Sequence, residues 1–329
     1  MASIASFFNN KGGVGKTTLL YHVAYVLAEV GHSVLMVDGD SQCNLTAYTL
    51  SEKQIEKAWE DSGNSIWRAI EPVARTIGDI RNRAPTVVDD NLSILPGDLL
   101  LSVFEDLLGE TWNSAKGGSE AALRAQSALY RAVMAAADKA GATIVLVDLG
   151  PNLGALNRAM LSGSDYFVVP IAPDLFSIRG TENLGSKLVK WRREWDQANA
   201  AWAGGAMIGL PHGAPKFAGF VTQQHNLRNT GAGMTQGWQL FGSRVEDAVQ
   251  ANIVDQLSPL DQIVEYTTPC YEICKIPNLH SLIPYSLAAR KPVFRCTSAD
   301  GLKGAHIEKA RESRVLFEPL ADTLADIMI

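Results

Sequence analysis

The 329-residue sequence has no apolar run longer than a buried strand. Runs such as ATIVLVDLG are far shorter than the roughly 20 apolar residues that a membrane-spanning helix needs. The sequence also opens without a basic segment followed by an apolar stretch and a cleavage site, so we expect no signal peptide. These two absences predict a cytoplasmic protein that has no membrane partner.

Cysteine is also scarce. The chain has four cysteines, at Cys43, Cys270, Cys274 and Cys296, and none forms a CxxC pair. We therefore expect reduced thiols rather than a disulfide framework. Cys270 and Cys274 lie four residues apart, but a metal site there would need two further donors, and none is evident nearby.

Positive charge is not in excess, since the formal net charge is −6. This excludes capture of nucleic acid by the surface as a whole, although it does not exclude a local basic patch. The sequence is 47% hydrophobic and 19% charged, which is ordinary for a globular protein. We find no internal repeat and no low-complexity tail.

Buried strands alternating with helices dominate what is present. Strands are expected at 4–10, 33–40, 91–97, 143–151, 165–173 and 216–224, and clear helices at 17–31 and 119–141. This order predicts an α/β fold with a mostly parallel twisted sheet flanked by helices on both faces. Residues 51–90 resemble surface helices. Residues 191–274 are weakly patterned, and the part AWAGGAMIGLPHGAP is expected to be a loop or insertion.

The stretch NNKGGVGKTT lies between the first strand and the first helix. It matches the phosphate-loop pattern GxxxxGK[ST] at Gly15, Lys16 and Thr17, while Asn10 replaces the first glycine. Lys16 is expected to hold the β- and γ-phosphates, and Thr17 to ligate Mg²⁺. The predicted nucleotide-binding residues here are Gly12, Gly13, Val14, Gly15, Lys16, Thr17 and Thr18.

A second lysine, Lys11, precedes these glycines. KGGVGKTT resembles the deviant Walker A motif of the ParA/MinD superfamily of P-loop ATPases, and in particular the ParA/Soj-type partition ATPases. In that family two protomers enclose two ATP molecules, and the early lysine crosses to the partner's phosphates. The resemblance therefore implies that Lys11, Lys16 and an acid act together in catalysis.

Two further motifs support this resemblance. DGDSQCN, residues 38–44, is similar to the family segment DxDPQxN, with Ser41 replacing proline. The resemblance implies that Asp40 positions or activates the attacking water and belongs to the metal site. Asp38 and Asp40 could alternatively cap the next helix. TIVLVDLGP resembles the Walker B strand, which makes Asp148 the acid of the Mg²⁺ shell, although Gly150 replaces a family proline.

The base site is implied by similarity near the C-terminus. KIPNLHSLIPYSLAARKPVF resembles the stretch whose loop lies beside adenine in relatives. Ile276, Pro277 and Asn278 are the candidates there, joined by Thr222 and Gln223 at the end of the preceding strand. Asn278 stands where relatives have arginine.

The branch of the superfamily is a separate question. The cysteines lie far from the switch turn, which argues against an iron–sulfur branch, and the C-terminal helix is acidic, which argues against a MinD-type membrane helix. A helix-turn-helix extension before the phosphate loop is absent, which argues against a repressor-type ParA. Basic residues are interleaved with Trp191 and Trp195. They form either a DNA-binding face or a solvated helix face. The DNA-binding candidates are Lys187, Lys190, Arg192, Arg193, Arg290, Lys291 and Arg295.

Two functional hypotheses follow from the resemblance. The first is one ParA-like domain over 1–329 that uses ATP and Mg²⁺, forms an ATP-dependent homodimer, binds DNA non-specifically and responds to a ParB-like activator. Such a protein would be nucleoid-associated. The second is a nucleotide-switched scaffold without a DNA role. The resemblance covers 1–50, 91–108, 141–190, 216–224 and 273–295, so 51–90 and 225–272 are atypical and could dock partner proteins.

Overall fold

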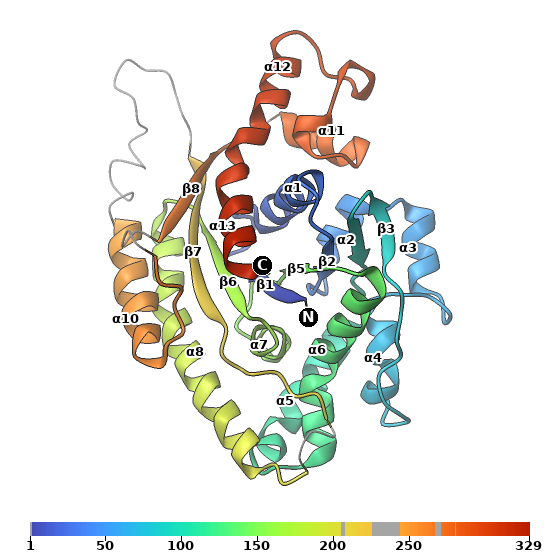
Figure 1. Ribbon diagram of the computed structural model, residues 1–329, viewed down its shortest axis with the longest axis vertical. Helices are drawn as coiled ribbons and strands as arrows, with labels where there is room; N and C mark the ends of the chain where they lie inside the picture. The colour runs from blue at the N-terminus through green and yellow to red at the C-terminus, as the bar shows by residue number, and fades with distance from the viewer. Residues whose placement is uncertain (1, 205–207, 226–243, 267–270, 280) are drawn as a thin grey trace.

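Eight strands form one sheet in the order β3-β4-β2-β5-β1-β6-β7-β8 (Figure 1). The computed structural model describes all residues except 1, 205–207, 226–243, 267–270 and 280. All neighbouring strands are parallel except β3 and β4, which are antiparallel. The strands are β1 (Ser3–Phe7), β2 (Val34–Asp38), β3 (Thr86–Asp89), β4 (Leu92–Leu95), β5 (Ile144–Asp148), β6 (Tyr166–Ile171), β7 (Lys216–His225) and β8 (Glu272–Pro277).

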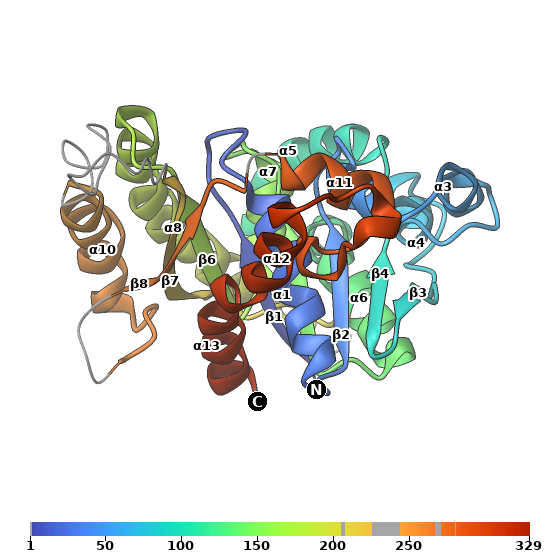
Figure 2. The ribbon, with the colours of Figure 1, turned by 90° about the horizontal axis from the view of Figure 1, so that it is seen from above.

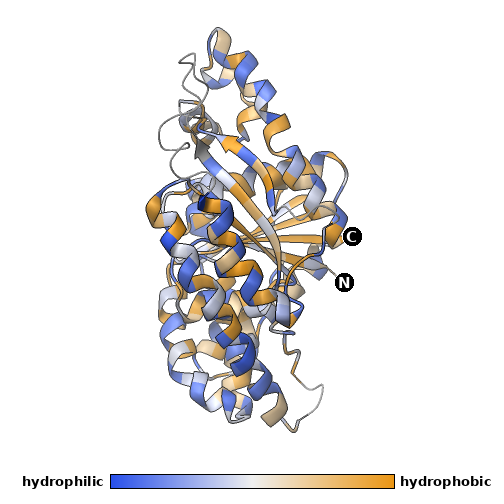
Figure 3. Ribbon diagram, turned by 90° about the vertical axis from the view of Figure 1, so that its left-hand side faces the viewer, coloured by the Kyte–Doolittle hydropathy of each residue, from blue (hydrophilic) through white to orange (hydrophobic). Residues whose placement is uncertain are grey.

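Side chains of the central strands alternate between two apolar cores. On β5, Val145 and Val147 enter one core, while Ile144 and Leu146 enter the other. Successive strand residues point to opposite faces, so a strand that is apolar throughout must be covered on both sides. Figure 3 shows these apolar strands between helices that carry polar residues on their outer sides.

Helices cover both faces of the sheet (Figure 2). One core includes residues of α4 (Ile66–Ala74), α5 (Leu101–Lys116), α6 (Glu120–Ala140), α7 (Ala155–Ser162) and α8 (Leu175–Ala201). The other includes residues of α1 (Lys16–Glu29), α2 (Asn44–Thr49), α11 (Leu282–Ala289), α12 (Ala305–Glu312) and α13 (Glu318–Met328). Shorter elements are α3 (Glu52–Trp59), η2 (Gln250–Val254), α10 (Asp255–Leu257), η3 (Ser258–Leu260), η4 (Val293–Arg295), η5 (Ser298–Asp300) and η6 (Ser313–Leu316).

The predicted architecture is confirmed, with three local corrections. Strands β3 and β8, at the two edges, were not predicted. α4 is not a simple surface helix, because Ile66, Trp67 and Ile70 are buried in the core. α8 extends through Trp191 to Ala201, where the sequence suggested weak structure. No described helix combines the length and the hydropathy that crossing a membrane requires.

The parallel register brings three strand ends together. Asp148, the last residue of β5, lies opposite Phe7 of β1 and Asp38 of β2. The loops that follow β1, β2 and β5 therefore leave the sheet side by side. Ligands of open α/β sheets bind at this edge, outside the carboxyl ends of the strands.

Candidate nucleotide-binding site

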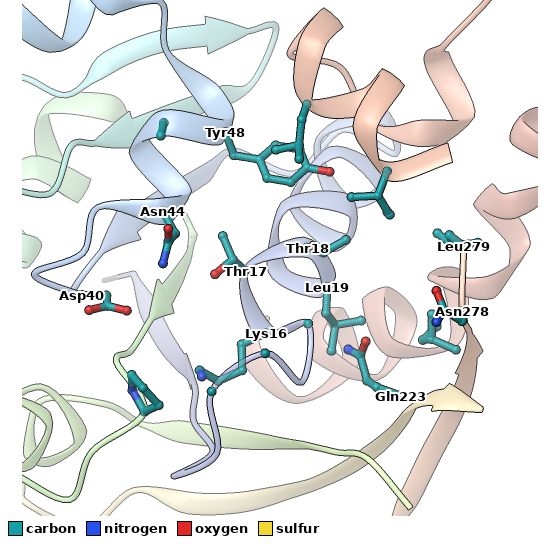
Figure 4. Close-up of a pocket in the computed structure, with 18 of the residues that line it drawn as sticks. Lys16, Thr17, Thr18, Leu19, Asp40, Asn44, Tyr48, Gln223, Asn278 and Leu279 are labelled. Carbon is teal, nitrogen blue, oxygen red and sulfur yellow. The ribbon is translucent and has the colours of Figure 1, made fainter. Parts of the chain in front are cut away.

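A cavity of about 570 Å³ opens at this edge of the sheet. A volume of this size lies within the range of small-molecule sites. Figure 4 shows its two ends, with Lys16, Thr17 and Asp40 at one and Gln223, Asn278 and Leu279 at the other. Tyr48 of α2 lies between them. The polar end thus suits phosphates, and the opposite end suits an aromatic base.

The loop before α1 lines the polar end of the cavity with Gly12, Gly13 and Gly15. Gly13 and Gly15 have φ of 73° and 91°, a left-handed conformation that favours glycine. No side chain caps the start of α1, and its first turn has no acidic residue. The first N–H groups of the helix therefore have no intrahelical acceptor, so this end of α1 suits an anion.

Lys16 begins α1 and is only 7% exposed. Burial lowers the pKa of its ammonium group, while the carboxylates of Asp148 and Asp40 oppose that shift. A buried ammonium needs compensating negative charge. Two acids supply part of this compensation, and the phosphates of a nucleotide in the cavity would supply more.

Asp148 and Thr17 form the second polar feature. Thr17 Oγ1 donates to Asp148 Oδ2 at 2.6 Å, and burial raises the pKa of Asp148 to about 7. The other carboxylate oxygen, Asp148 Oδ1, is buried and has no hydrogen-bond partner among the described residues. A hydroxyl beside a carboxylate with a spare oxygen fits Mg²⁺ and its water shell.

Asp40 and Asp38 have different surroundings, although they are two residues apart. Asp38 is fully buried, and its Oδ2 accepts from Thr46 N and Thr46 Oγ1, both at 2.7 Å. Asp38 thus holds α2 against the sheet. Asp40 is partly exposed and lines the cavity. A Cβ atom at Gly150 would lie 3.1 Å from Asp40 Oδ1, so glycine at this position leaves room for the carboxylate.

Lys11 and Lys16 are separated although they share one loop. Lys11 Nζ pairs with Asp174 Oδ2 at the start of α8, and neither residue lines the cavity. Burial alone would raise the pKa of Asp174, but Lys11 and the Ser177 N–H outweigh burial and lower it. Sequence reasoning missed Asp174, although an acid directly after a strand, at the start of a helix, was a usable signal.

The base end contains Ile276, Pro277 and Asn278 in the cavity lining. Thr222 lies outside the lining, and its hydroxyl donates to Glu272 Oε1. Its neighbour Gln223 points to the opposite side of β7 and lines the cavity, and its buried Nε2 has no partner among the described residues. Val14 is buried and also lies outside the lining.

The basic candidates differ in how they are engaged. Arg192 pairs with Asp196 at 2.8 Å, Lys291 pairs with Asp300 at 2.8 Å, and Arg290 donates to the Leu50 carbonyl at 2.9 Å. Arg295 pairs with Glu29 and Asp89. The exposed residues Lys187, Lys190 and Arg193 form no ion pair with any residue that the structure describes.

Two expectations about side chains need correction or fall outside the described residues. Trp191 and Trp195 are not interleaved on the basic face of α8, because they are 7% and 1% exposed and pack inward. Among the described residues, Cys43, Cys274 and Cys296 are free thiols, and no cluster of three metal-ligating side chains occurs. Cys270 lies outside the described residues.

Comparison with known proteins identifies the family. A family model described as an AAA domain, of the ParA/MinD type, matches residues 2–199, more than half of the chain. The chain belongs to the ParA/MinD superfamily of P-loop ATPases. It is 32% identical over 184 residues to the sporulation initiation inhibitor protein Soj of Bacillus subtilis, covering 56% of this chain and 64% of Soj.

A second relative of this chain is the chromosome partitioning protein ParA of Caulobacter vibrioides. It is 28% identical over 188 residues, covering 55% of this chain and 60% of that protein. Both matches span less than two thirds of the relative's length. The part of the chain after residue 199 lies beyond the family match.

Solved structures of similar proteins share this fold. Protein DIP2308 of Corynebacterium diphtheriae superposes with a TM-score of 0.67 and 26% identity, covering 88% of this chain and 97% of that one. The Cyanothece McdA(D38A)–ATP complex superposes with a TM-score of 0.64 and 13% identity, covering 98% and 96%. Because its identity is only 13%, the likeness to McdA shows the fold alone.

Proposed function

We propose that this protein is a ParA-type ATPase that binds ATP with Mg²⁺, dimerises on ATP and binds DNA non-specifically to partition a plasmid, chromosome or other cargo. The observation that carries the proposal is the separation of the two lysines. Lys16 lines the cavity and is influenced by the charges of Asp148 and Asp40, while Lys11 lies outside the cavity and pairs with Asp174. This separation supports the proposal that Lys11 serves a nucleotide other than its own.

The chemistry assigned to the chain's residues is phosphoryl transfer to water. The loop amides and Lys16 bind the phosphates and offset the negative charge that develops on them. Thr17 and Asp148 would hold Mg²⁺, which supplies further charge neutralisation when it is bound. Asp40 orients the attacking water and accepts its proton. Ile276, Pro277, Asn278 and Gln223 enclose the base.

The hydrolysis step is tested by Asp40→Ala. ATP binding should persist, hydrolysis should be lost, and the dimer should accumulate with ATP. Turnover of labelled ATP and sedimentation velocity measure the two outcomes. Asp90→Ala, which removes an exposed acid beyond the cavity lining, is the matched control. Hydrolysis at the wild-type rate in Asp40→Ala would remove Asp40 from its proposed role.

The DNA step is tested by binding to non-specific duplex DNA with ATP and with ADP across a salt series. Tight, salt-sensitive binding with ATP alone is the expected result. A ParB-like activator would then release the complex by stimulating hydrolysis. Dimerisation on ATP without any DNA binding would favour the second candidate, a nucleotide-switched scaffold that docks proteins. The observation behind that alternative is that the atypical segment 51–90 contributes the helices α3 and α4.

A further inference from the structure

A groove separates α4 from α5, on the helical layer that packs against α6. Its volume is about 420 Å³, which is enough for several aliphatic side chains. α4 supplies Trp67 and Ala74, α5 supplies Val103 and Leu107, and Leu100 directly precedes α5. None of these residues lines the nucleotide cavity, so the groove is a separate site.

The apolar side chains along this groove are unusually exposed. Val103 is 55% exposed and Leu100 is 40% exposed, and the adjoining Leu99 is 55% exposed. Leu100, Val103 and Leu107 recur at helical spacing, so they form one stripe along α5. A continuous exposed apolar stripe beside a hollow is typical of a surface that binds another helix.

The side chains beside this stripe that could pair with a partner are negatively charged. Asp106 and Glu110 also line the groove and are exposed, and neither forms an ion pair with any residue that the structure describes. They lie four residues apart on one helix, a spacing at which like charges repel each other. The one basic residue in the lining, Arg75, is already paired with Glu71 at 2.9 Å.

A buried donor beneath the groove lacks an acceptor. Trp67 lines the groove and is 4% exposed, and its Nε1–H has no hydrogen-bond partner among the described residues. Buried polar groups are usually satisfied, so an orphan donor beside a hollow points to an acceptor supplied from outside the chain.

We propose that the α4–α5 groove binds a basic amphipathic helix of a partner protein. The apolar stripe would receive the apolar face of that helix, and Asp106 and Glu110 would pair with its lysines or arginines. This inference goes beyond the proposed function, because it requires neither nucleotide nor DNA. It gives part of the atypical segment 51–90 a role, since α4 forms one wall.

The test uses a fluorescent model peptide of about 18 residues with leucine at positions i, i+3, i+4 and i+7 and lysine elsewhere. Its affinity for the full chain is measured by fluorescence anisotropy at low salt, without nucleotide. The first variant is Asp106→Lys/Glu110→Lys. Its matched control is Glu308→Lys/Glu312→Lys, which reverses two exposed acids at the same spacing on α12. A peptide with glutamate in place of lysine tests the sign of the charge.

The α5 charge reversal should weaken peptide binding about tenfold or more, and the α12 reversal by less than about twofold. Val103→Ser keeps every charge and should weaken binding about threefold, while Val87→Ser, at a valine that is 74% exposed on β3, should not. Absence of peptide binding, equal losses in the two charge reversals, or equal binding of the glutamate peptide would overturn the proposal. Nucleotide-independent self-association that Val103→Ser abolishes would assign the groove to a second copy instead.

Discussion

The phosphate loop and the basic face of α8 both depend on lysine, but the fold treats them differently. Lys16 is 7% exposed and is influenced by the charges of two acids, one of them fully buried. Lys187 and Lys190 are exposed to solvent on α8. Burying charge is costly unless other groups compensate, whereas an exposed lysine costs almost nothing. The burial of Lys16 therefore points to a ligand that compensates its charge, whereas the exposure of Lys187 and Lys190 requires no ligand.

The largest expected effect comes from removing the buried lysine. Lys16→Ala should weaken ATP binding at least about a hundredfold, because phosphates in the cavity would lose their charged partner. Titration with a fluorescent ATP analogue measures the affinity. Lys190→Ala, which removes an exposed lysine, is the control and should leave the affinity within about twofold. Equal effects of the two changes would abolish the contrast between the regions.

The second prediction concerns the buried acid beside Lys16. Asp148→Asn should raise the free energy of unfolding of the ligand-free protein at pH 8 by about 2 kcal/mol or more. Burial raises the pKa of Asp148 from 3.8 to about 7, so the folded state binds more protons than the unfolded state between these values. Wild-type stability therefore falls as pH rises from about 4 to about 7, and asparagine removes that contribution.

Denaturant titrations at pH 5 and pH 8 check this prediction. The gain should be larger at pH 8, and the variant should lose the stabilisation that ATP with Mg²⁺ gives the wild type. Asp138→Asn, at an exposed acid on α6, should change stability by less than about 0.5 kcal/mol at either pH. A loss of stability at pH 8 on Asp148→Asn would show that the carboxylate is compensated in the folded protein.

The third prediction tests the exposed region. Replacing Lys187, Lys190 and Arg193 together by alanine should weaken ATP-dependent DNA binding about tenfold and reduce the salt slope by about 3. Arg192→Ala should have less effect, because Arg192 is already paired with Asp196. Filter binding across a salt series gives both quantities. An unchanged salt slope would show that this face of α8 is an ordinary solvated surface.

The smallest effect is expected at the contact between the two regions, where Lys11 of the loop meets Asp174 at the start of α8. Asp174→Asn should strengthen the ATP-dependent dimer up to about fivefold, because a surface ion pair is worth at most about 1 kcal/mol. Asparagine can still accept from Ser177 N, so the cap of α8 is kept. Sedimentation measures the dimer constant, and a weaker dimer would mean that Asp174 helps to place Lys11 across the interface.

Local pattern was enough to predict most of the fold. Six strands could be read from short apolar runs, because strands covered on both faces must be apolar throughout. The edge strands β3 and β8 could not, because their side chains are mostly half-buried and their residues are mixed. The tail of α8 was missed because its burial depends on α5, where Trp112 stacks on Trp195 at 6.1 Å.

The sequence by itself determined the phosphate loop, since Gly13 and Gly15 supply the required backbone angles and Lys16 must follow at the start of α1. Only the tertiary structure decided which side chains meet there. Parallel register brings Asp148 beside Asp38, burial separates the roles of Asp38 and Asp40, and α8 supplies the partner of Lys11. Backbone angles are set by neighbouring residues, whereas the contacts of Asp38 with Asp148 and of Lys11 with Asp174 join residues more than a hundred positions apart.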